Sequence, residues 1–327
     1  MHAIVVDSTG GPEALVLKEI PKPTPRAGEA LIHVRAAGIN FIDVYYRTGL
    51  YKKETPFTAG QEGAGVIEAA GDGTDLGKYG LKLGDRVTFV YFAGTYAEYC
   101  VVPVDKLVPV PEGISDLNAC VAMVQGMTAQ YLSHDTYPIG RGETVLIHAA
   151  AGGVGQLLVQ MAKMRGAIVI GTVGSAEKAA LARADGADHT VDYNTQEFDV
   201  EVKRLTAGIG VPVVYDSVGK ATFEKSLNSL RPRGYLVLYG QSSGTVPPFD
   251  LGQLAAKGSL YVTRPTLVSY TLTRQELLER ANAVFGMMLS GAVKIRGGGV
   301  YKLSEAARAH RDLEARKTTG KLILTPN

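Results

Sequence analysis

A glycine-rich turn at residues 150–155, Ala-Ala-Gly-Gly-Val-Gly, has residue types and spacing that suit phosphate binding. It follows a short apolar run, 144–148, and precedes apolar residues at helical spacing. Gly152 and Gly155 stand at the second and third glycine positions of the dinucleotide fingerprint, and Ala150 replaces the first. Gly152 lets backbone N–H groups approach a pyrophosphate, and Gly155 lets the helix pack closely on the strand. The turn predicts dinucleotide binding, with a turn that binds no ligand as the alternative.

The residues after the second strand of this region predict which dinucleotide binds. Enzymes that use NAD usually place Asp or Glu there, where the carboxylate accepts hydrogen bonds from the ribose 2′-hydroxyl. This chain has Gly174 and Ser175 at that point and no carboxylate. Lys178 follows in the first turn of the next expected helix, where an ammonium group would pair with a 2′-phosphate. We therefore expect NADPH, although Lys178 is also compatible with an ordinary solvated lysine.

Composition and charge exclude several other classes of protein. The 327 residues are 46% hydrophobic and 20% charged, which is typical of a globular protein and not of a disordered one. The net charge of +2 is too weak to indicate nucleic-acid binding. Cys100 and Cys120 form no metal-ligand pattern, so we expect two buried or half-buried thiols. No apolar run reaches about 18 residues and no signal-segment pattern opens the chain, so we expect a cytoplasmic protein without a membrane span.

The spacing of apolar residues predicts two kinds of domain. Short strands broken by Gly and Pro fill the first third, which is typical of a β-rich barrel or sandwich. Strands then alternate with helices, which is typical of an α/β fold with a doubly wound parallel sheet. The expected strands are 3–6, 15–19, 30–37, 63–70, 86–90 and 97–102, followed by 144–148, 167–172, 189–191, 213–217, 235–239 and 260–263.

Helices complete the predicted pattern. After the glycine turn, they are expected from the N-cap Ser175 to residue 184, over 198–206 and over 221–230. Beyond residue 265 the pattern changes to helices at 274–290 and 304–316 and a last strand at 321–324. Because the alternating region already holds six or more α/β elements, we expect this tail to return to the first domain.

Four segments give the chain a clear resemblance to a known family. They are residues 38–51, 148–155, 214–219 and 258–265. They resemble the zeta-crystallin-like quinone oxidoreductases of the medium-chain dehydrogenase/reductase superfamily, and the resemblance covers essentially the whole chain in order. It implies a GroES-like catalytic domain formed by residues 1–123 and 267–327 around a Rossmann NADPH-binding domain at 124–266.

The resemblance also bears on metal use. Zinc alcohol dehydrogenases of the same superfamily have a catalytic Cys where this chain has Asn40, and a metal-ligating His where it has Gln61. They also carry a four-cysteine lobe, which this chain lacks. Zinc needs thiolate, imidazole or carboxylate ligands in close array, so we expect no metal. A quinone then suits the chain better than an alcohol, because it is already electrophilic and needs mainly positioning and protons.

Site residues follow from the resemblance as well. Asn40, Asp43, Tyr45 and Tyr51 are expected on the substrate side as catalytic candidates, although the tyrosines are also compatible with packing and Asp43 with a cap or ion pair. Cofactor contacts are expected mainly at the carboxyl ends of the strands, where ligands of open α/β sheets bind. They are Phe41, Ile42, Thr128, Ala150, Gly152, Gly153, Val154, Gly155, Gly174, Ser175, Lys178, Tyr193, Ser217, Gly240, Gln241, Ser242, Ser243, Val262, Thr263 and Arg264.

Two positions depart from the pattern of the relatives. Asp192 precedes Tyr193 where some relatives have a neutral residue, and an inward-pointing acid there would oppose a 2′-phosphate. Lys321 stands where relatives often have a small polar residue, which leaves a cofactor contact at that position open.

The leading hypothesis is an NADPH-dependent, zinc-independent quinone reductase that passes a hydride or electrons from NADPH to a quinone. A reductase of activated double bonds, such as an enone or enal, would use the same hydride geometry with a different pocket. A non-enzymatic alternative is an NADPH-regulated RNA-binding or crystallin-like protein, although the weak net charge argues against RNA. The apolar segment 259–262 is a candidate edge strand that invites pairing with its own copy, so we expect a homodimer.

Overall fold

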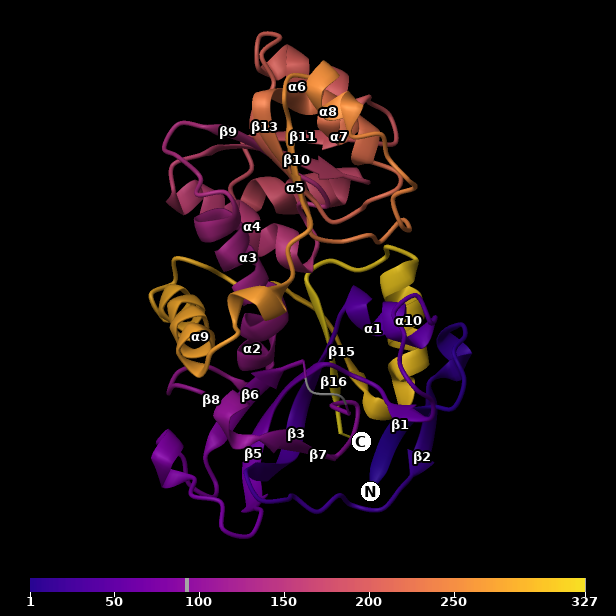
Figure 1. Cartoon of the computed structure of the whole chain (residues 1–327), viewed down its shortest axis with the longest axis vertical. Coiled ribbons are helices and arrows are strands. Elements are labelled where there is room, and N and C mark those ends of the chain that lie inside the picture. Colours follow the sequence, from indigo (N-terminus) through magenta and orange to yellow (C-terminus); the bar gives the residue numbers. More distant parts are fainter. Residues whose placement is uncertain (92–93, 327) are drawn as a thin grey trace. The chain divides into compact units, whose positions relative to one another are not determined.

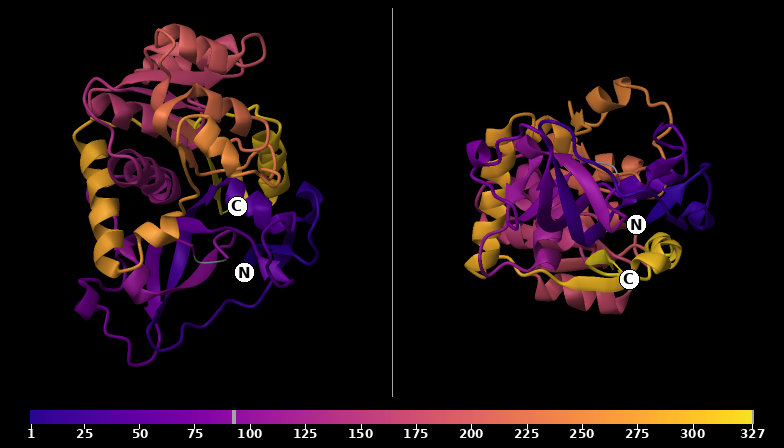
Figure 2. Two further views of the ribbon diagram at one scale, coloured as in Figure 1. Left: turned by 45° about the horizontal axis from the view of Figure 1, so that its top comes forward. Right: turned by 90° about the horizontal axis from the view of Figure 1, so that it is seen from below.

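The computed structural model describes residues 1–91 and 94–326. The chain folds as two compact units. The first consists of Met1–Met127, Thr271–Gly291 and Ile295–Asn327, and the second of Thr128–Tyr270 with Ala292–Lys294. Both chain ends therefore belong to the first unit. Figure 1 and Figure 2 label them N and C. Within the described ranges, no helix combines the length and the apolar character needed to cross a bilayer.

The first unit is built on β-strands. They are β1 (His2–Val6), β2 (Val16–Glu19), β3 (Glu29–Ile39), β4 (Phe57–Thr58), β5 (Glu62–Ala70), β6 (Arg86–Val90), β7 (Tyr99–Pro103), β8 (Val108–Pro109), β15 (Gly297–Lys302) and β16 (Lys321–Thr325). A seven-stranded sheet has the order β15-β16-β3-β5-β6-β8, with β7 also paired to β3, and a smaller sheet has the order β2-β1-β4. The C-terminal strand β16 thus pairs with β3, antiparallel, with Leu324 opposite Ala37.

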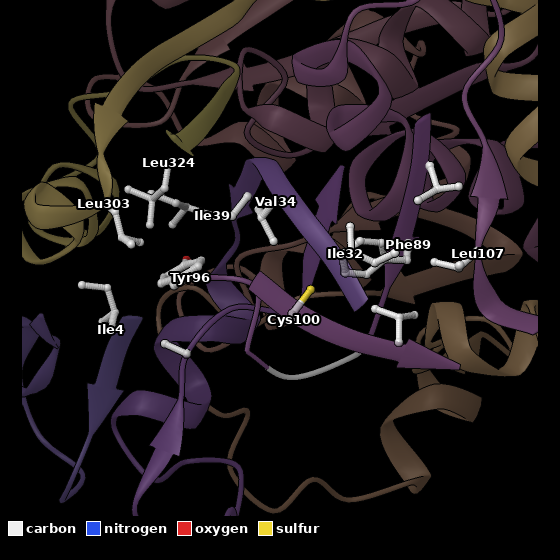
Figure 3. Close-up of a cluster of buried hydrophobic side chains, with 14 of the residues drawn as sticks. Ile4, Ile32, Val34, Ile39, Phe89, Tyr96, Cys100, Leu107, Leu303 and Leu324 are labelled. Atoms are coloured by element: carbon white, nitrogen blue, oxygen red, sulfur yellow. The ribbon is translucent and has the colours of Figure 1, made fainter. Parts of the chain in front are cut away.

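The core of the first unit collects apolar side chains from both ends of the chain. Ile32 and Val34 of β3, Phe89 of β6 and Leu324 of β16 are buried in one cluster with Ile4 of β1. Figure 3 shows these side chains together. Burial of each such side chain contributes about 1.5–3 kcal/mol, so the last strand helps to stabilise a core begun by the first.

The α-helices of the first unit are α1 (Phe41–Arg47), α2 (Asp116–Val121), α9 (Arg274–Leu289) and α10 (Ala306–Glu314), while a π-helix over Ala122–Gly126 leads into α3 (Met127–Tyr131), where the units divide. Side-chain caps mark the start of some of them. Ser115 caps α2 by accepting from the backbone N–H of Asn118. Thr273 and Glu276 form a capping box at the start of α9.

The second unit alternates strands and helices. Its strands are β9 (Thr144–Ile147), β10 (Ile168–Val173), β11 (His189–Asp192), β12 (Val211–Asp216), β13 (Leu230–Leu238) and β14 (Tyr261–Thr263). Its helices after α3 are α4 (Gly153–Met164), α5 (Ala176–Ala184), α6 (Phe198–Leu205), α7 (Phe223–Ser229) and α8 (Gly252–Ala256).

All strand pairs of the second unit are parallel, in the order β11-β10-β9-β12-β13-β14. This is the doubly wound Rossmann order, and the direction of winding changes between β9 and β12, where ligands of such sheets bind. The predicted α/β class with a doubly wound parallel sheet is confirmed.

Several elements differ from the sequence-based expectation. The pattern did not predict α1, α8 or β15, and the expected helix 304–316 begins with a 3-10 turn, so that α10 starts only at Ala306. Gly297, Gly298 and Gly299 make β15 unlike a typical strand, because glycine has no side chain to pack and weakens strand interiors. Hydrogen bonding to β16 holds β15 in a strand conformation that its own glycine-rich sequence does not favour.

Candidate functional site

One set of candidate residues gathers around α1 in the first unit. Asn40 is the N-cap residue of α1, and its backbone N–H donates to Asp43 Oδ2 at 2.8 Å. Tyr45 is buried in the same helix, and its ring centroid lies 5.2 Å from that of Tyr51. The backbone N–H of Tyr51 also donates to the carbonyl of Tyr45 at 3.0 Å. One short helix and the turn after it therefore bring together the four residues that the sequence suggests as catalytic candidates.

The side chain of Asn40 hydrogen-bonds to both members of a buried ion pair, Glu62 of β5 and Lys321 of β16. Lys321 Nζ donates to Glu62 Oε1, and also to Asn40 Oδ1 at 2.7 Å. Asn40 Nδ2 donates to Glu62 Oε1 at 2.7 Å, and the backbone N–H of Val124 donates to Glu62 Oε2 at 2.8 Å. Both charged side chains are fully excluded from solvent. Their charges compensate each other, and the amide of Asn40 is held in one orientation.

Gly38 makes room for this pair. A Cβ at position 38 would overlap Glu62 Oε1 and Lys321 Cε. Gly38 lies opposite Ile323 of β16, so the register that places β16 beside β3 also places the end of the Lys321 side chain against residue 38. A side chain at this position would displace one of the two charges.

Asp43 is also the last member of a series of hydrogen-bonded polar side chains inside the first unit. Tyr96 Oη lies 3.1 Å from Asp43 Oδ2 and 3.1 Å from His310 Nε2, and Arg47 Nη1 lies 3.1 Å from His310 Nδ1. Because Arg47 can only donate, His310 accepts at Nδ1 and carries its proton on Nε2. His310 then donates to Tyr96, and Tyr96 donates to Asp43. Arg47 completes the line with two bonds to Glu314, at 2.9 and 2.8 Å.

The electrostatics of this line favour proton exchange at Asp43. Burial raises the pKa of Asp43 to about 7, against the hydrogen bonds from Asn40 and Tyr96 and the charge of Lys321, which favour the ionised form. Asp43 Oδ1 has no hydrogen-bond partner among the residues that are described. Burial, with the charge of Arg47, lowers the pKa of His310 to about 3, so the imidazole is neutral. Asp43 is thus a carboxyl group that takes up and releases a proton near neutral pH.

The positions compared above with zinc ligands carry amides. Asn40 and Gln61 are both buried. In the ranges 1–91 and 94–326, no cluster of three His, Cys, Asp or Glu residues is arranged to hold a metal ion. Cys100 and Cys120 are buried free thiols, as predicted, and burial raises the pKa of each.

The glycine turn lies between β9 and α4 in the second unit. Gly152 is the N-cap of the twelve-residue helix α4, and because glycine has no side chain, no cap from this residue occupies the N–H groups at the helix start. A Cβ at Gly152 would lie 3.0 Å from the carbonyl oxygen of Ala149. One at Gly155 would overlap that oxygen and lie 2.9 Å from Ala150 Cα. The turn therefore has the close packing that glycine permits, at the N-terminus of a helix, which is a kind of position that binds pyrophosphate groups.

A second cofactor candidate region lies at the carboxyl end of β10. Ser175 caps α5, and its Oγ accepts from the backbone N–H of Lys178 at 3.2 Å. A Cβ at Gly174 would overlap the hydroxyl of Tyr193, so the tyrosine packs directly against the backbone there. These four predicted residues lie together. The same first turn of α5 also holds Glu177, which is exposed.

The loops after β12 and β13 approach each other closely. A Cβ at Gly240 would lie 2.6 Å from the carbonyl oxygen of Ser217. Gln241, Ser242 and Ser243 continue this loop, and Ser243 Oγ donates to the carbonyl of Val218 at 2.7 Å. The remaining predicted cofactor residues of the unit are Thr128 in α3, Gly153 and Val154 at the start of α4, Val262 and Thr263 in β14, and Arg264 directly after it.

The predicted residues thus form two sets. Asn40, Phe41, Ile42, Asp43, Tyr45 and Tyr51 belong to the first unit, and the other cofactor candidates belong to the second. The sequence left open whether Lys321 contacts the cofactor. In the structure its ammonium group is paired with Glu62. The sequence did not indicate Glu62, Tyr96, Arg47 or His310. The only local signals were Gly38 and the Asn40–Asp43 spacing, which is typical of a helix N-cap.

Comparison with known proteins places both units in described families. Residues 26–112 match the family described as alcohol dehydrogenase GroES-like domain, and residues 153–282 match the family described as zinc-binding dehydrogenase. A quinone oxidoreductase of Pseudomonas aeruginosa is 47% identical over 319 residues, which cover 97% of each chain. A 2-haloacrylate reductase of a Burkholderia species is 40% identical over 333 residues, covering 99% of this chain and 98% of the relative.

The chain is also similar to solved structures of quinone oxidoreductases. The crystal structure of Escherichia coli quinone oxidoreductase complexed with NADPH superposes with a TM-score of 0.96 at 41% identity, and the match covers all of both chains.

Removing one charge of the buried pair should destabilise the protein strongly. In Glu62→Gln the Lys321 ammonium group loses its counter-charge while buried, so we expect the free energy of unfolding to fall by about 3–5 kcal/mol. The double variant Glu62→Gln/Lys321→Met removes both charges and should recover much of the loss. Thermal and urea unfolding would measure both.

The control is Glu197→Gln, which breaks an exposed pair with Lys225 and should leave the melting temperature nearly unchanged. A Glu62→Gln protein that melts like the wild type would contradict the structural role of the pair.

Proposed function

Because this chain belongs to the zeta-crystallin-like quinone oxidoreductases of the medium-chain dehydrogenase/reductase superfamily, we propose that it is an NADPH:quinone oxidoreductase. Near full-length identity of 47% to a quinone oxidoreductase carries the proposal. The geometry of the glycine turn, which fits a pyrophosphate, supports it independently. Reduction of a quinone to a hydroquinone adds a hydride and a proton, and bound NADPH supplies the hydride.

We assign the NADPH-binding role to residues 124–266. The turn at Ala150, Gly152, Gly153, Val154 and Gly155 would hold the pyrophosphate. Gly174, Ser175, Lys178 and Tyr193 would surround the adenosine end, with Lys178 paired to the 2′-phosphate. The other proposed contacts in this domain are Thr128, Ser217, Gly240, Gln241, Ser242, Ser243, Val262, Thr263 and Arg264. Phe41 and Ile42 are proposed contacts from the first domain.

We assign substrate binding and proton handling to residues 1–123 and 267–327. Asn40, Asp43, Tyr45 and Tyr51 are the proposed catalytic group. Among them Asp43 is the residue suited to hold a proton, since burial raises its pKa to about 7 and Oδ1 lacks a partner in the described part of the chain. Asn40 is suited to orient a carbonyl, because its amide is fixed by Glu62 and Lys321.

The reaction proposed here is independent of zinc. Amides stand at residues 40 and 61, and the ammonium group of Lys321 lies 2.7 Å from Asn40 Oδ1. An ammonium group at that distance would repel a divalent cation, and amide groups are poor ligands for zinc.

Two further properties belong to the proposal, a cytoplasmic location and a homodimer. Strand β14 ends the parallel sheet, and Tyr261 and Val262 on it are exposed, at 51% and 38%. An exposed apolar edge strand is a template for pairing with a second copy around a two-fold axis.

The activity itself can be tested by following NADPH oxidation. We expect turnover with benzoquinone or naphthoquinone that a chelator such as EDTA leaves unchanged. Absence of turnover above background would contradict the quinone reductase assignment, and loss of turnover with EDTA would contradict zinc independence. A 2-haloacrylate or a conjugated ketone should be included, because the Burkholderia relative is named for that chemistry. Faster turnover with those substrates would favour a double-bond reductase.

Lys178 should determine the preference for NADPH. Lys178→Ala removes the proposed partner of the 2′-phosphate, so we expect KM for NADPH to rise about tenfold, while KM for NADH stays unchanged. Initial rates with each cofactor would measure this. Lys220→Ala, at an exposed lysine after β12, is the control. An equal rise in both KM values for Lys178→Ala would contradict the assignment.

The homodimer should depend on the edge strand. Wild-type protein is expected to elute and scatter light as a dimer at micromolar concentration. Val262→Lys places a charge on the exposed edge, which discourages strand pairing, so it should shift the mass toward that of a monomer. Light scattering that shows a wild-type monomer would contradict the proposal.

A further inference from the structure

Inside the second unit, a buried line of hydrogen bonds begins at Ala149, beside the glycine turn. The backbone N–H of Ala149 donates to Thr172 Oγ1 at 3.3 Å, and Thr172 Oγ1 lies 2.9 Å from His148 Nδ1. His148 Nε2 lies 3.0 Å from Ser226 Oγ, which donates to Asp216 Oδ2 at 2.9 Å. The side chains of Thr172, His148, Ser226 and Asp216 are all buried. We call these five residues the His148 relay.

Each hydrogen bond of the His148 relay has a single direction. The hydroxyl proton of Ser226 is committed to Asp216, so Ser226 accepts from His148, which carries its proton on Nε2. Burial lowers the pKa of His148, so the imidazole is neutral and Nδ1 has no proton. Thr172 therefore donates its hydroxyl proton to Nδ1. Its oxygen remains free to accept from Ala149.

The His148 relay connects two loops that follow neighbouring strands. At one end, Thr172 holds Ala149 through its hydroxyl and Ala150 through its carbonyl, which accepts from the Ala150 N–H at 3.0 Å. Ala149 has a φ of 50°, in the left-handed region that non-glycine residues rarely adopt. At the other end, Asp216 Oδ1 accepts from the backbone N–H groups of Val218 and Gly219 at 2.7 and 3.0 Å.

These two loops lie on either side of the point where the sheet reverses its winding. The glycine turn follows β9, and Ser217 with its neighbours follows β12, the strand beside β9. A binding loop whose shape is fixed in advance loses less entropy when the ligand arrives and therefore binds it more tightly. The relay fixes the left-handed residue from which the turn starts.

We propose that the His148 relay sets the affinity for NADPH by holding the glycine turn in its binding conformation. His148 and Thr172 are positioning residues that act through the turn, and Ser226 with Asp216 holds the imidazole in its tautomer. The proposal rests on the proposed function, in that NADPH occupies the turn.

The test measures the Kd of NADPH for the full chain by fluorescence titration. Thr172→Val keeps the shape of the side chain but removes the hydroxyl, and we expect Kd to rise about three- to tenfold, as expected for one lost hydrogen bond. Thr172→Ser keeps the hydroxyl and should stay within about twofold of the wild type. Ser226→Ala, at the far side of the imidazole, should also raise Kd. The double variant Thr172→Val/Ser226→Ala should bind no more weakly than Thr172→Val, because both changes interrupt one line.

Thr88→Val is the matched control. Thr88 is a buried threonine of the first unit whose hydroxyl donates to the carbonyl of Gly63 at 2.8 Å. It should lower the melting temperature without changing Kd. If Thr172→Val does not fold, Ser226→Ala carries the test.

The outcomes separate this proposal from the function on which it rests. Wild-type protein that does not bind NADPH would overturn both. Wild-type protein that binds NADPH, with Thr172→Val or Ser226→Ala binding equally well, would overturn the relay alone. An equal rise in Kd for Thr88→Val would also overturn it, because the effect would then be a general loss of rigidity.

Discussion

The charge pair of Glu62 and Lys321 constrains the whole first unit. Two opposite charges without access to water must meet, so β16 has to lie in one register beside β3, which pairs with β5 on its other edge. That register requires a glycine at position 38 and leaves Asn40 at the end of β3, with its amide bonded to both charges. The start of α1, and with it Asp43, follows from the same arrangement. A substrate site built here depends on strands from opposite ends of the chain.

Both units use the same physical means to fix their candidate binding groups. In each, a neutral buried histidine donates to a hydroxyl group that donates in turn to a buried carboxyl group: His310 through Tyr96 to Asp43, and His148 through Ser226 to Asp216. Burial lowers the pKa of both imidazoles, so each stays neutral, and its hydrogen-bond partners fix its tautomer. Binding groups held this way are already oriented before a ligand arrives.

The sequence predicts those features that depend on local spacing. The parallel strands, the N-cap Ser175 and the glycine turn were all indicated by short patterns of apolar, polar and glycine residues. Helix α1 was not predicted, because its aromatic and β-branched residues show no clear helical spacing over seven positions. The Glu62–Lys321 pair left no local trace except Gly38. Its partners are 259 positions apart, and only the sheet brings them together.

The order in which the chain is synthesised gives this separation a further consequence. Strands β3 and β5 leave the ribosome early, yet the ammonium group that neutralises Glu62 lies in the last strand. The second unit, which lies almost entirely within Thr128–Tyr270, has all of its residues synthesised before β16 is made. Synthesis of the first unit therefore begins before that of the second unit and is completed after it. Until β16 arrives, residues 37–39 at the end of β3 lack their partner strand, and an unpaired strand edge exposes a nascent chain to aggregation.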